Sequence, residues 1–463
     1  MAIFDVIVIG AGPAGESVAG QLADRAHDVA IVESHLVGGE CAFYACMPSK
    51  ALLRPAEALA EVRRVPGAAE SVTGEIAVAA ALARRDEVIH HLDDSSQLGW
   101  LADRGITLIR GHARLDGERG VRVDSDRHEA RRAVVVAVGS GAEVPPIPGL
   151  ADARPWTSRE ATTSHVVPRR LVVLGGGVVG VELAQAYSEL GAAVSLLEAA
   201  DRLLANEEEF VGDELRRALA ERGVEVALGV EVRRVDRYDR TVIVELNDGS
   251  RVEGDEILVA VGRWPLTDDL GLETVGLQPG ESINVDNTLR VPGSPWLYAI
   301  GDVNQRALFT HAAKYQARVA AMLIDDGTAV ATADERGVPR VVFTDPQVAA
   351  VGLTLDQARD RGIDARAYDV PSANNAGASF HGHNTAGIAR IVVDEDRGVL
   401  VGATFIGSEV AEWLHAATIT ITAEIPIAQL WEAIPVFPTR SEVWLQLLQR
   451  RDEVLRLNVH RSG

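Results

Sequence analysis

The sequence predicts an α/β fold organised around two Rossmann-like dinucleotide-binding units. The first observation is a glycine-rich turn that follows a β-branched run near the start of the chain. The second is a copy of the same pattern 165 residues later, with identical internal spacing. The third is the length of 463 residues, which suggests about three domains. Two matching fingerprints therefore imply two nucleotide-binding domains in one chain.

The first fingerprint combines a strand, a glycine turn and a helix. Residues 3–9 are apolar and rich in β-branched side chains, which is typical of a buried parallel strand. The turn carries Gly10, Gly12 and Gly15, and a helical pattern leads from it to a second strand that ends at Glu33. The glycines let the backbone approach a pyrophosphate at the helix N-terminus, and we expect Glu33 to accept hydrogen bonds from a ribose.

The second fingerprint repeats these spacings residue for residue. Its glycines are Gly175, Gly177 and Gly180, and its acid is Glu198. A carboxylate suits a free ribose 2′-hydroxyl and repels a 2′-phosphate, so Glu198 favours NADH over NADPH. Arg202 lies close enough in the sequence to weaken that preference, which leaves NADPH as the alternative donor.

Each fingerprint is followed by a strand that runs into a proline-containing turn. Residues 134–141 lead to a turn at 145–149, and residues 257–263 lead to a Trp-Pro pair. We interpret both as chain crossings between domains. Residues 76–105 are rich in alanine with interspersed charges, which predicts a helical excursion rather than a site.

The chain has only two cysteines, Cys41 and Cys46, and they lie five positions apart. On a regular helix this spacing separates Cα atoms by roughly 8–9 Å, whereas a disulfide tolerates at most about 7 Å. Bonding would require a distorted backbone, which Gly38 and Gly39 before the pair and Pro48 after it permit. No histidine lies nearby at ligand spacing, so we assign no metal. A reversible dithiol/disulfide is favoured over two inert buried thiols.

Composition and the start of the chain argue against several functional classes. The net charge of −22 disfavours a nucleic-acid partner, because such binding depends on Lys and Arg. No apolar run reaches the 18 or so residues of a membrane span. The apolar run at the start lacks a preceding basic region, so we expect no secretory signal and a cytoplasmic location.

On these motifs the chain resembles the class I flavoprotein disulfide reductases, the family of dihydrolipoamide dehydrogenase, glutathione reductase and mercuric reductase. The resemblance covers nearly the whole length, and its most specific feature is a C-x4-C segment followed by Pro-Ser-Lys between two fingerprints. It implies FAD at the first fingerprint, NAD(P)H at the second, and a homodimer formed by a C-terminal α+β dimerisation domain. The expected ranges are 1–150 and 275–335 for FAD, 151–274 for NAD(P)H, and 336–463 for dimerisation.

The resemblance also implies roles for individual residues. Cys46 resembles the thiolate beside the flavin, and Cys41 the thiol that meets substrate. Lys50 and Glu182 would pair near the flavin, and Asp302 would bind the ribitol. The glycines expected to contact cofactors beyond the two fingerprints are Gly139, Gly262 and Gly301.

The last segment departs from the family pattern His-Pro-Thr-x-Ser-Glu. Phe437 replaces the histidine, whereas Glu442 is retained. In the family that histidine comes from the partner subunit and moves the proton of the interchange thiol, which phenylalanine cannot do. General acid–base catalysis contributes about 10²–10⁴-fold, so we expect poor turnover of dithiol substrates. The resemblance thus implies electron transfer from NADH through FAD to a quinone-like or other small, non-lipoyl acceptor.

Other interpretations stay open at this point. If His311 or Tyr44 replaces the missing acid, the chain is a dihydrolipoamide dehydrogenase or a low-molecular-weight disulfide reductase; His381 and His383 are weaker candidates. A low-turnover redox sensor or scaffold is the least favoured. Mercury is disfavoured as the acceptor because mercuric reductases use a further cysteine pair near the C-terminus, which this chain lacks.

Overall fold

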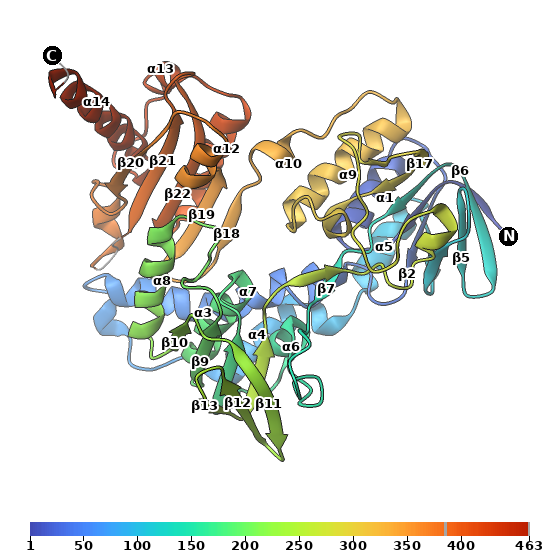
Figure 1. The fold of residues 1–463 in the computed structure, drawn as a ribbon, viewed down its shortest axis with the longest axis horizontal. Helices are drawn as coiled ribbons and strands as arrows, with labels where there is room; N and C mark the ends of the chain where they lie inside the picture. The colour runs from blue at the N-terminus through green and yellow to red at the C-terminus, as the bar shows by residue number, and fades with distance from the viewer. Residues whose placement is uncertain (384–386, 462–463) are drawn as a thin grey trace.

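The structure is a computed structural model that describes residues 1–383 and 387–461. Its described strands form five sheets, of which three are large enough to organise the molecule. Figure 1 shows these three bodies, with the N-terminal sheet on one side, the second sheet below and the C-terminal sheet opposite. Parallel sheets covered by helices in the first two bodies confirm the predicted α/β class.

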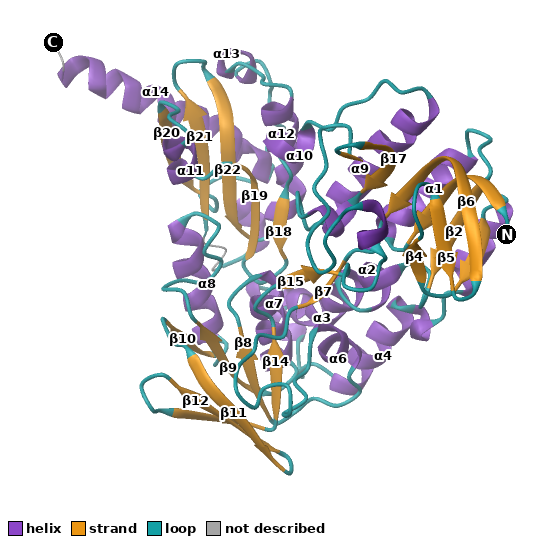
Figure 2. Ribbon diagram, turned by 45° about the vertical axis from the view of Figure 1, so that its right-hand side comes forward, coloured by secondary structure: helices purple, strands orange, loops and turns teal. Residues whose placement is uncertain are grey.

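The first sheet carries the N-terminal fingerprint. Its main path runs β16-β17-β6-β1-β2-β3, with parallel pairing from β17 to β3. The bounds are β1 (Ile3–Ile9), β2 (Val29–Glu33), β3 (Thr107–Arg110), β6 (Asp126–Val136), β16 (Arg290–Val291) and β17 (Ser294–Ala299). Two helices, α1 (Pro13–Ala23) and α9 (Thr310–Asp325), pack against one another and against this sheet over a core of valine, leucine and alanine. Figure 2 shows this layer of helices beside the strands.

Several smaller elements complete the first body. A hairpin of β4 (Ala113–Leu115) and β5 (Gly120–Val123) pairs with β6. The helical excursion predicted for the alanine-rich stretch is confirmed by α4 (Val78–Val88) and α5 (Ser95–Asp103). The alanines and leucines of α4 pack on α3 (Cys46–Arg64), so this excursion supports the helix that follows the cysteine pair.

The second sheet repeats the first. It is parallel throughout, in the order β10-β9-β8-β14. The elements are α6 (Ser158–Thr163), β8 (Arg170–Leu174), α7 (Val178–Glu189), β9 (Ala193–Glu198), α8 (Glu209–Glu221), β10 (Glu225–Leu228) and β14 (Glu256–Val259). Val6 of β1 pairs with Val29 of β2, and Leu171 of β8 pairs with Val194 of β9. The sequence repeat is therefore a structural repeat with the same strand register.

Two antiparallel units accompany the second sheet, and one of them connects it to the first body. One is a meander of β11 (Val232–Tyr238), β12 (Thr241–Leu246) and β13 (Arg251–Gly254). The other is a short ribbon in which β7 (Ser140–Ala142) pairs with β15 (Arg263–Pro265). Both crossings predicted at the proline-containing turns meet in this ribbon, so the chain leaves and re-enters the first body at one place.

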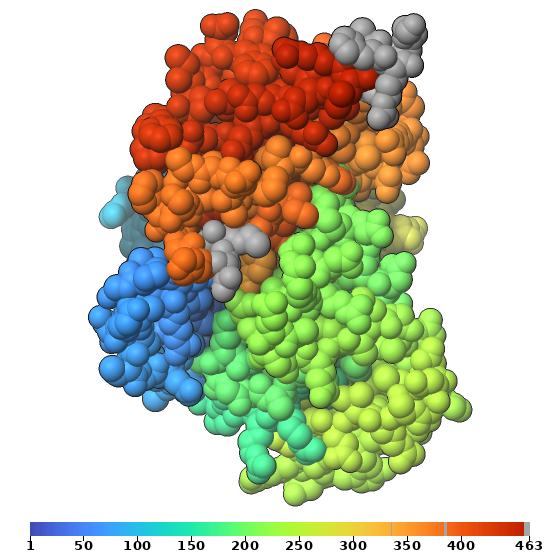
Figure 3. Space-filling view, turned by 90° about the vertical axis from the view of Figure 1, so that its left-hand side faces the viewer, coloured from blue at the N-terminus to red at the C-terminus, as the bar shows by residue number. Residues whose placement is uncertain are grey.

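The C-terminal body is an antiparallel sheet with helices, which confirms the predicted α+β domain. Its order is β18-β19-β22-β21-β20. The elements are α10 (Ala333–Arg336), β18 (Arg340–Val342), β19 (Gln347–Gly352), α11 (Leu355–Asp360), β20 (Ala365–Pro371), β21 (Ile388–Asp394), β22 (Val399–Gly407), α12 (Val410–Thr422), α13 (Ile427–Leu430) and α14 (Val443–Arg461). The core lies between the sheet and α12, where Phe405 contacts Trp413 and Trp444. Figure 3 shows this body seated on both the second body and the stretch after α3.

Helix length and polarity bear on membrane insertion. Among the residues that the structure describes, none of the helices has the length and apolar composition needed to cross a bilayer.

Candidate active site

The two cysteines lie at a break between two helices. The short helix α2 (Gly39–Phe43) holds Cys41, and α3 begins at Cys46. Between them Ala45 has φ −134° and ψ −91°, which is outside helical geometry. The expected distortion is therefore present, and both thiols are free in this structure. The break removes the spacing that a continuous helix would impose, and the two thiols hydrogen-bond to one another.

The residues expected to permit the break flank it. Gly38 and Gly39 adopt positive φ, at 114° and 62°, where a β-carbon is disfavoured. Pro48 lies in the first turn of α3, where proline is tolerated, and its ring would clash with the carbonyl of Tyr44 if the helix continued back through that residue. The position of Pro48 is therefore consistent with the expectation.

One hydroxyl lies between the two sulfurs. Thr310 Oγ1, on the first residue of α9, is 3.1 Å from Cys41 Sγ and 3.6 Å from Cys46 Sγ. Contact between α9 and the cysteine segment joins parts of the chain more than 260 positions apart. The sulfur pair is thus held against α9, the helix that follows Asp302.

The two thiols have opposite acidities. A hydrogen bond from Cys41 lowers the pKa of Cys46 to about 6, with further help from Thr310 and Lys50 and against the effect of burial. The same coupling to Cys46, together with burial, raises the pKa of Cys41. These shifts favour Cys46 as the thiolate of the reduced pair and Cys41 as the protonated thiol. This matches the roles that the resemblance implies for the two residues.

A buried ion pair lies one helical turn beyond Cys46. Lys50 Nζ donates to Glu182 Oε2 at 2.7 Å, and Glu182 is only 3% exposed. The backbone N–H of Phe343 donates to the other oxygen of Glu182 at 2.9 Å. Lys50 also lies 4.9 Å above the ring of Phe343. The expected pairing of Lys50 with Glu182 is thus present, and it joins α3 to α7.

Both glycine turns have room for a phosphate. A β-carbon on Gly12 or Gly177, each the N-cap of its helix, would meet no protein atom within 4 Å. A β-carbon on Gly15 would lie 1.9 Å from the carbonyl oxygen of Gly10, and the corresponding distance from Gly180 to Gly175 is 1.8 Å. The third glycine therefore packs helix against strand, whereas the second leaves an open cradle at the helix N-terminus. The residues present fit FAD at the first cradle and a nicotinamide dinucleotide at the second.

The acid of each fingerprint holds its own glycine turn. Glu33 accepts hydrogen bonds from the backbone N–H groups of Ala11 and His35, at 2.8 and 2.7 Å. Glu198 accepts from the equivalent groups of Gly176 and Ala200. A carboxylate has about four acceptor positions, so each acid retains capacity for ribose hydroxyls at the mouth of its cradle.

The remaining expected cofactor residues lie around the connecting ribbon. Ser140 donates to Asp302 at 2.6 Å, and Arg263 donates to Ser140 at 2.8 Å. Gly301 has φ +77° and donates its N–H to the buried amide of Gln316 at 2.8 Å. The other two expected glycines, Gly139 and Gly262, precede β7 and β15. The ribbon thus gathers this group between the two cradles.

The segment that departs from the family pattern is exposed. Phe437 is 73% exposed, whereas Arg440 in the same segment is 5% exposed. All three guanidinium nitrogens of Arg440 and one oxygen of Glu442 are buried without a hydrogen-bond partner among the described residues. Burial lowers the pKa of Arg440 to about 10, and its guanidinium lies 4.5 Å from the Trp413 ring. The segment therefore combines the exposed side chain of Phe437 with the desolvated polar groups of Arg440 and Glu442.

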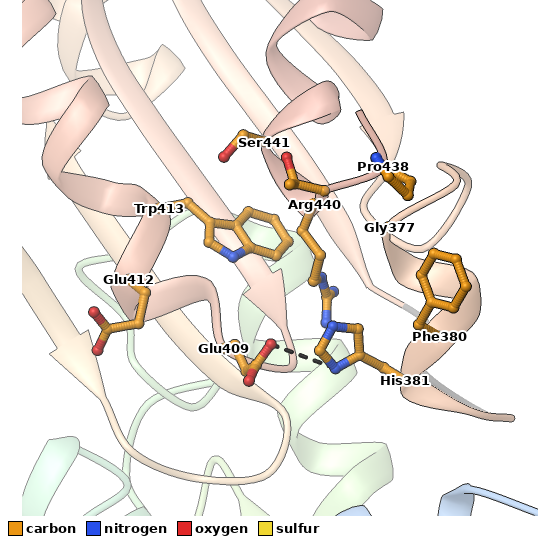
Figure 4. Close-up of a pocket in the computed structure, with 10 residues that line it drawn as sticks. Gly377, Phe380, His381, Glu409, Glu412, Trp413, Pro438, Arg440 and Ser441 are labelled. Carbon is orange, nitrogen blue, oxygen red and sulfur yellow. Dashed lines mark ion pairs between the residues drawn. The ribbon is translucent and has the colours of Figure 1, made fainter. Parts of the chain in front are cut away.

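A cavity of about 390 Å³ adjoins this segment. Figure 4 shows Arg440 extending from the segment toward His381 and Glu409, which form an ion pair at 3.4 Å. This cavity belongs to the C-terminal body, and neither cysteine lines it. Across the described residues, no group of three or more metal-ligating side chains comes together.

The structure gives little support to the candidates for a replacement acid. His311 hydrogen-bonds to the carbonyl of Pro339 and stacks on Phe309, and partial desolvation lowers its pKa. The Tyr44 ring lies 4.4 Å from the Arg159 guanidinium. His383 is exposed, with its N–H bonded to the carbonyl of Arg64. Among the described residues, no histidine or tyrosine hydrogen-bonds to either sulfur.

Sequence analysis missed two residues of this site. Thr310 is the residue before His311, and only the placement of α9 against α2 and α3 reveals its contact with the sulfurs. Phe343 lies in the range expected for dimerisation, yet its N–H and ring both contact the Lys50–Glu182 pair. Neither residue lies in a spacing pattern that signals chemistry.

Comparisons with known proteins agree with this geometry. The model of the pyridine nucleotide-disulphide oxidoreductases matches residues 4–317, and that of their dimerisation domain matches residues 338–448. The chain is 32% identical over 451 residues to dihydrolipoyl dehydrogenase from Thermus scotoductus, covering 96% of each protein. It is 30% identical over 445 residues to mercuric reductase from Staphylococcus aureus, covering 95% of this chain and 81% of that protein.

Two groups of solved structures share the fold over almost their full length. A Cu(II) complex of the HOCl-induced flavoprotein disulfide reductase RclA from Escherichia coli has a TM-score of 0.86 at 27% identity, covering 97% of this chain and 99% of that chain. LpdA from Mycobacterium tuberculosis has a TM-score of 0.84 at 26% identity, with the same coverage.

Proposed function

Because this chain belongs to the pyridine nucleotide-disulphide oxidoreductase family, whose members are FAD-dependent enzymes that use NAD(P)H, we propose that Cys41 and Cys46 form its reversible disulfide. We further propose that electrons from NADH pass through FAD to a small acceptor of the quinone type rather than to a lipoyl group.

The arrangement around Cys46 carries the proposal. Bound FAD would supply a two-electron carrier between the nicotinamide and the sulfur pair. Glu182 holds the Lys50 ammonium near the start of α3, and this cation with the hydroxyl of Thr310 keeps Cys46 ionised. A thiolate is the form in which cysteine donates electrons or attacks a disulfide. Cys41 retains its proton until a base removes it.

The choice of acceptor rests on proton supply. Exchange with a dithiol substrate requires a group that takes up and returns a proton at Cys41, and Phe437 cannot serve. Neither His311 nor Tyr44 hydrogen-bonds to a sulfur among the described residues. A quinone takes its protons from water, so its reduction does not depend on this missing group.

A metal ion is a second candidate acceptor. The specific observation is the solved Cu(II) complex of RclA, which covers nearly the whole of this chain. A metal ion accepts electrons without a protein proton donor, as a quinone does. Mercury is less suited as the acceptor, since the only cysteines of this chain are Cys41 and Cys46.

The proposed division of the chain follows the sheets. We propose residues 1–150 and 275–335 as the FAD-binding part, because β16 and β17 return to the first sheet beside β6. Residues 151–274 would bind the nicotinamide dinucleotide. We propose NADH as the donor because Glu198 holds the second glycine turn, while Arg202 is bonded to the carbonyl of Ala205.

We also propose that residues 336–463 form a homodimer interface. Large apolar side chains are exposed along the segment that precedes Arg440: Trp431, Ile434, Val436 and Phe437. Ile434 is 89% exposed, which is costly for a surface that never meets a partner. A second copy covering this segment would bury these groups and bring Phe437 and Glu442 toward the partner's thiols, as the family arrangement implies.

An acceptor screen on the purified holoenzyme tests the proposal. Steady-state turnover with NADH is measured against menadione, Cu(II) and lipoamide under identical conditions, and NADPH replaces NADH in a parallel series. We expect menadione turnover to exceed lipoamide turnover by about 10²-fold or more, which is the scale of a lost acid–base catalyst. Lipoamide turnover equal to menadione turnover would contradict the proposed acceptor.

The matched control separates the disulfide from the flavin. In a Cys46→Ser variant the FAD content should stay unchanged, and reduction of disulfide acceptors should be lost. Anaerobic NADH should give the long-wavelength absorbance of a thiolate beside the flavin in the parent protein and not in Cys46→Ser. A parent protein without that absorbance would refute the redox role of the pair.

A further inference from the structure

The hydroxyl of Thr310 is shared between two sulfurs. Its Oγ1 donates to Cys41 Sγ at 3.1 Å and lies 3.6 Å from Cys46 Sγ, and it comes from a different helix than either cysteine. A hydroxyl carries a single proton, so Thr310 can donate to only one sulfur at a time. Which sulfur receives that proton depends on which of them is ionised.

The backbone does not compete for this proton. Other helical threonines bond back to the carbonyl four residues earlier, as Thr163, Thr418 and Thr420 do at 2.7, 3.1 and 2.8 Å. Thr310 is the first residue of α9, so no preceding helical turn offers such a carbonyl. Among the described residues, the hydrogen bonds of its hydroxyl go to the two sulfurs alone.

The charges around the pair come from three helices. Lys50 on α3 favours the Cys46 thiolate, and Glu182 on α7 opposes it. Lys314, one turn along α9 from Thr310, favours ionisation of Cys41. None of these groups hydrogen-bonds to a sulfur among the described residues, whereas the hydroxyl of Thr310 does. Apart from the hydrogen bond between the two cysteines, the hydroxyl of Thr310 is therefore the one hydrogen-bonding group that contacts the sulfurs among the described residues.

We propose that Thr310 is a positioning residue whose hydroxyl, which donates to Cys41 in this structure, turns to Cys46 when that sulfur is the thiolate and returns to Cys41 when that thiol loses its proton. The proposal rests on the reversible disulfide of the proposed function. Thr310 itself is neither oxidised nor deprotonated. Its contribution is a hydrogen bond to whichever sulfur carries the negative charge, and such bonds to charged groups are the strong ones.

Replacing the hydroxyl without changing the side-chain shape tests this role. Thr310→Val removes the donor and keeps the branched shape, and Thr310→Ser restores the donor. Thr328→Val is the matched control, since Thr328 is an exposed threonine in the loop after the same helix and bonds only to Asp326. Each holoenzyme is reduced with dithiothreitol, and the alkylation rates of Cys41 and Cys46 are measured separately across pH by peptide mass.

In the parent protein we expect the pH profile of Cys46 alkylation to have its midpoint on the acid side of neutrality. Thr310→Val should raise that midpoint by about one pH unit, equivalent to a tenfold loss of thiolate at fixed low pH. Thr310→Ser should restore the midpoint, so that the thiolate population at a fixed low pH is within about threefold of that in the parent protein. Thr328→Val should leave both rates unchanged.

An unchanged midpoint in a Thr310→Val protein with normal FAD content and unfolding temperature would overturn the proposal. Equal shifts in Thr310→Val and Thr310→Ser would also overturn it, because the cause would then be packing rather than the hydroxyl. The alkylation assay needs neither NADH nor an acceptor. If the midpoint shifts but NADH does not reduce the protein, the proposed function fails while the role of Thr310 stands.

Discussion

Removing the cation of Lys50 should weaken the Cys46 thiolate, and the structure sets the size of the effect. Lys50 follows Cys46 by four residues on α3, so their β-carbons lie about 5–6 Å apart. Two unit charges about 6 Å apart at an effective dielectric constant of about 20 interact by about 3 kcal/mol. That energy corresponds to about two pKa units at 1.36 kcal/mol per unit.

The neighbouring carboxylate reduces this effect. Glu182 lies 2.7 Å from the Lys50 ammonium and, with an exposed fraction of 3%, is poorly screened by water. Lys50 is 34% exposed, so part of its field is lost to solvent. We therefore expect Lys50→Met to raise the pKa of Cys46 from about 6 by about one to two units.

The partner variant should act in the opposite direction. Glu182 disfavours the Cys46 thiolate, so Glu182→Gln should lower the pKa of Cys46 by up to about one unit. The double variant Lys50→Met with Glu182→Gln removes both charges and should return close to the parent value. The measurement is the pH dependence of Cys46 alkylation in the reduced protein, together with the pH dependence of the thiolate absorbance beside the flavin.

The sign of the pH effect follows from a lowered thiol pKa. The Cys46 thiolate persists above about pH 6 in the parent protein and is lost as the pH falls through that value. In Lys50→Met the loss should occur at higher pH, so activity at pH 6 should fall more than activity at pH 9. A Cys46 pKa that stays unchanged or falls in Lys50→Met would refute the electrostatic role given to Lys50.

Two further predictions concern the departure from the family and the nucleotide cradle. Phe437→His should raise lipoamide turnover by about 10- to 100-fold over Phe437→Leu, because only histidine can move a proton; equal rates would show that the proton shuttle is not the limiting defect. Gly177→Ala should raise the KM for NADH by about tenfold or more without lowering the unfolding temperature, since its β-carbon would meet no protein atom within 4 Å. Gly180→Ala should instead lower the unfolding temperature by several degrees, at about 2–4 °C for each kcal/mol of lost stability, because its β-carbon would lie 1.8 Å from the Gly175 carbonyl oxygen. An unchanged unfolding temperature in Gly180→Ala would contradict this packing.

The nucleotide cradles could be predicted from sequence because their signals are local. The strand, the glycine turn and the helix are contiguous in the chain, and the acid follows within 23 residues of the first glycine. The structure confirms both turns and adds that Glu33 and Glu198 bond to equivalent backbone groups. The break between α2 and α3 was likewise predictable, since the geometry of a regular helix does not allow the two sulfurs to meet.

The neighbours of the thiol pair were not predictable in the same way. Thr310 reaches the sulfurs because β17 pairs with β6 and so returns α9 to the first body. Phe343 reaches the Lys50–Glu182 pair because the C-terminal body packs on the second. The position of Pro48 is consistent with its expected role, since α3 restarts at Cys46, two residues before the proline.

The sequence by itself determined the two dinucleotide cradles, the reactive cysteine pair and the loss of the family histidine at Phe437. Each depends on residues that are close together in the chain, where spacing dictates geometry. Only the tertiary structure revealed the distant groups that tune the Cys46 thiol, because the hydroxyl of Thr310 and the carboxylate of Glu182 come from helices far from the cysteines in sequence. Electrostatic and hydrogen-bond energies depend on distance in space, and the packing of whole domains sets that distance.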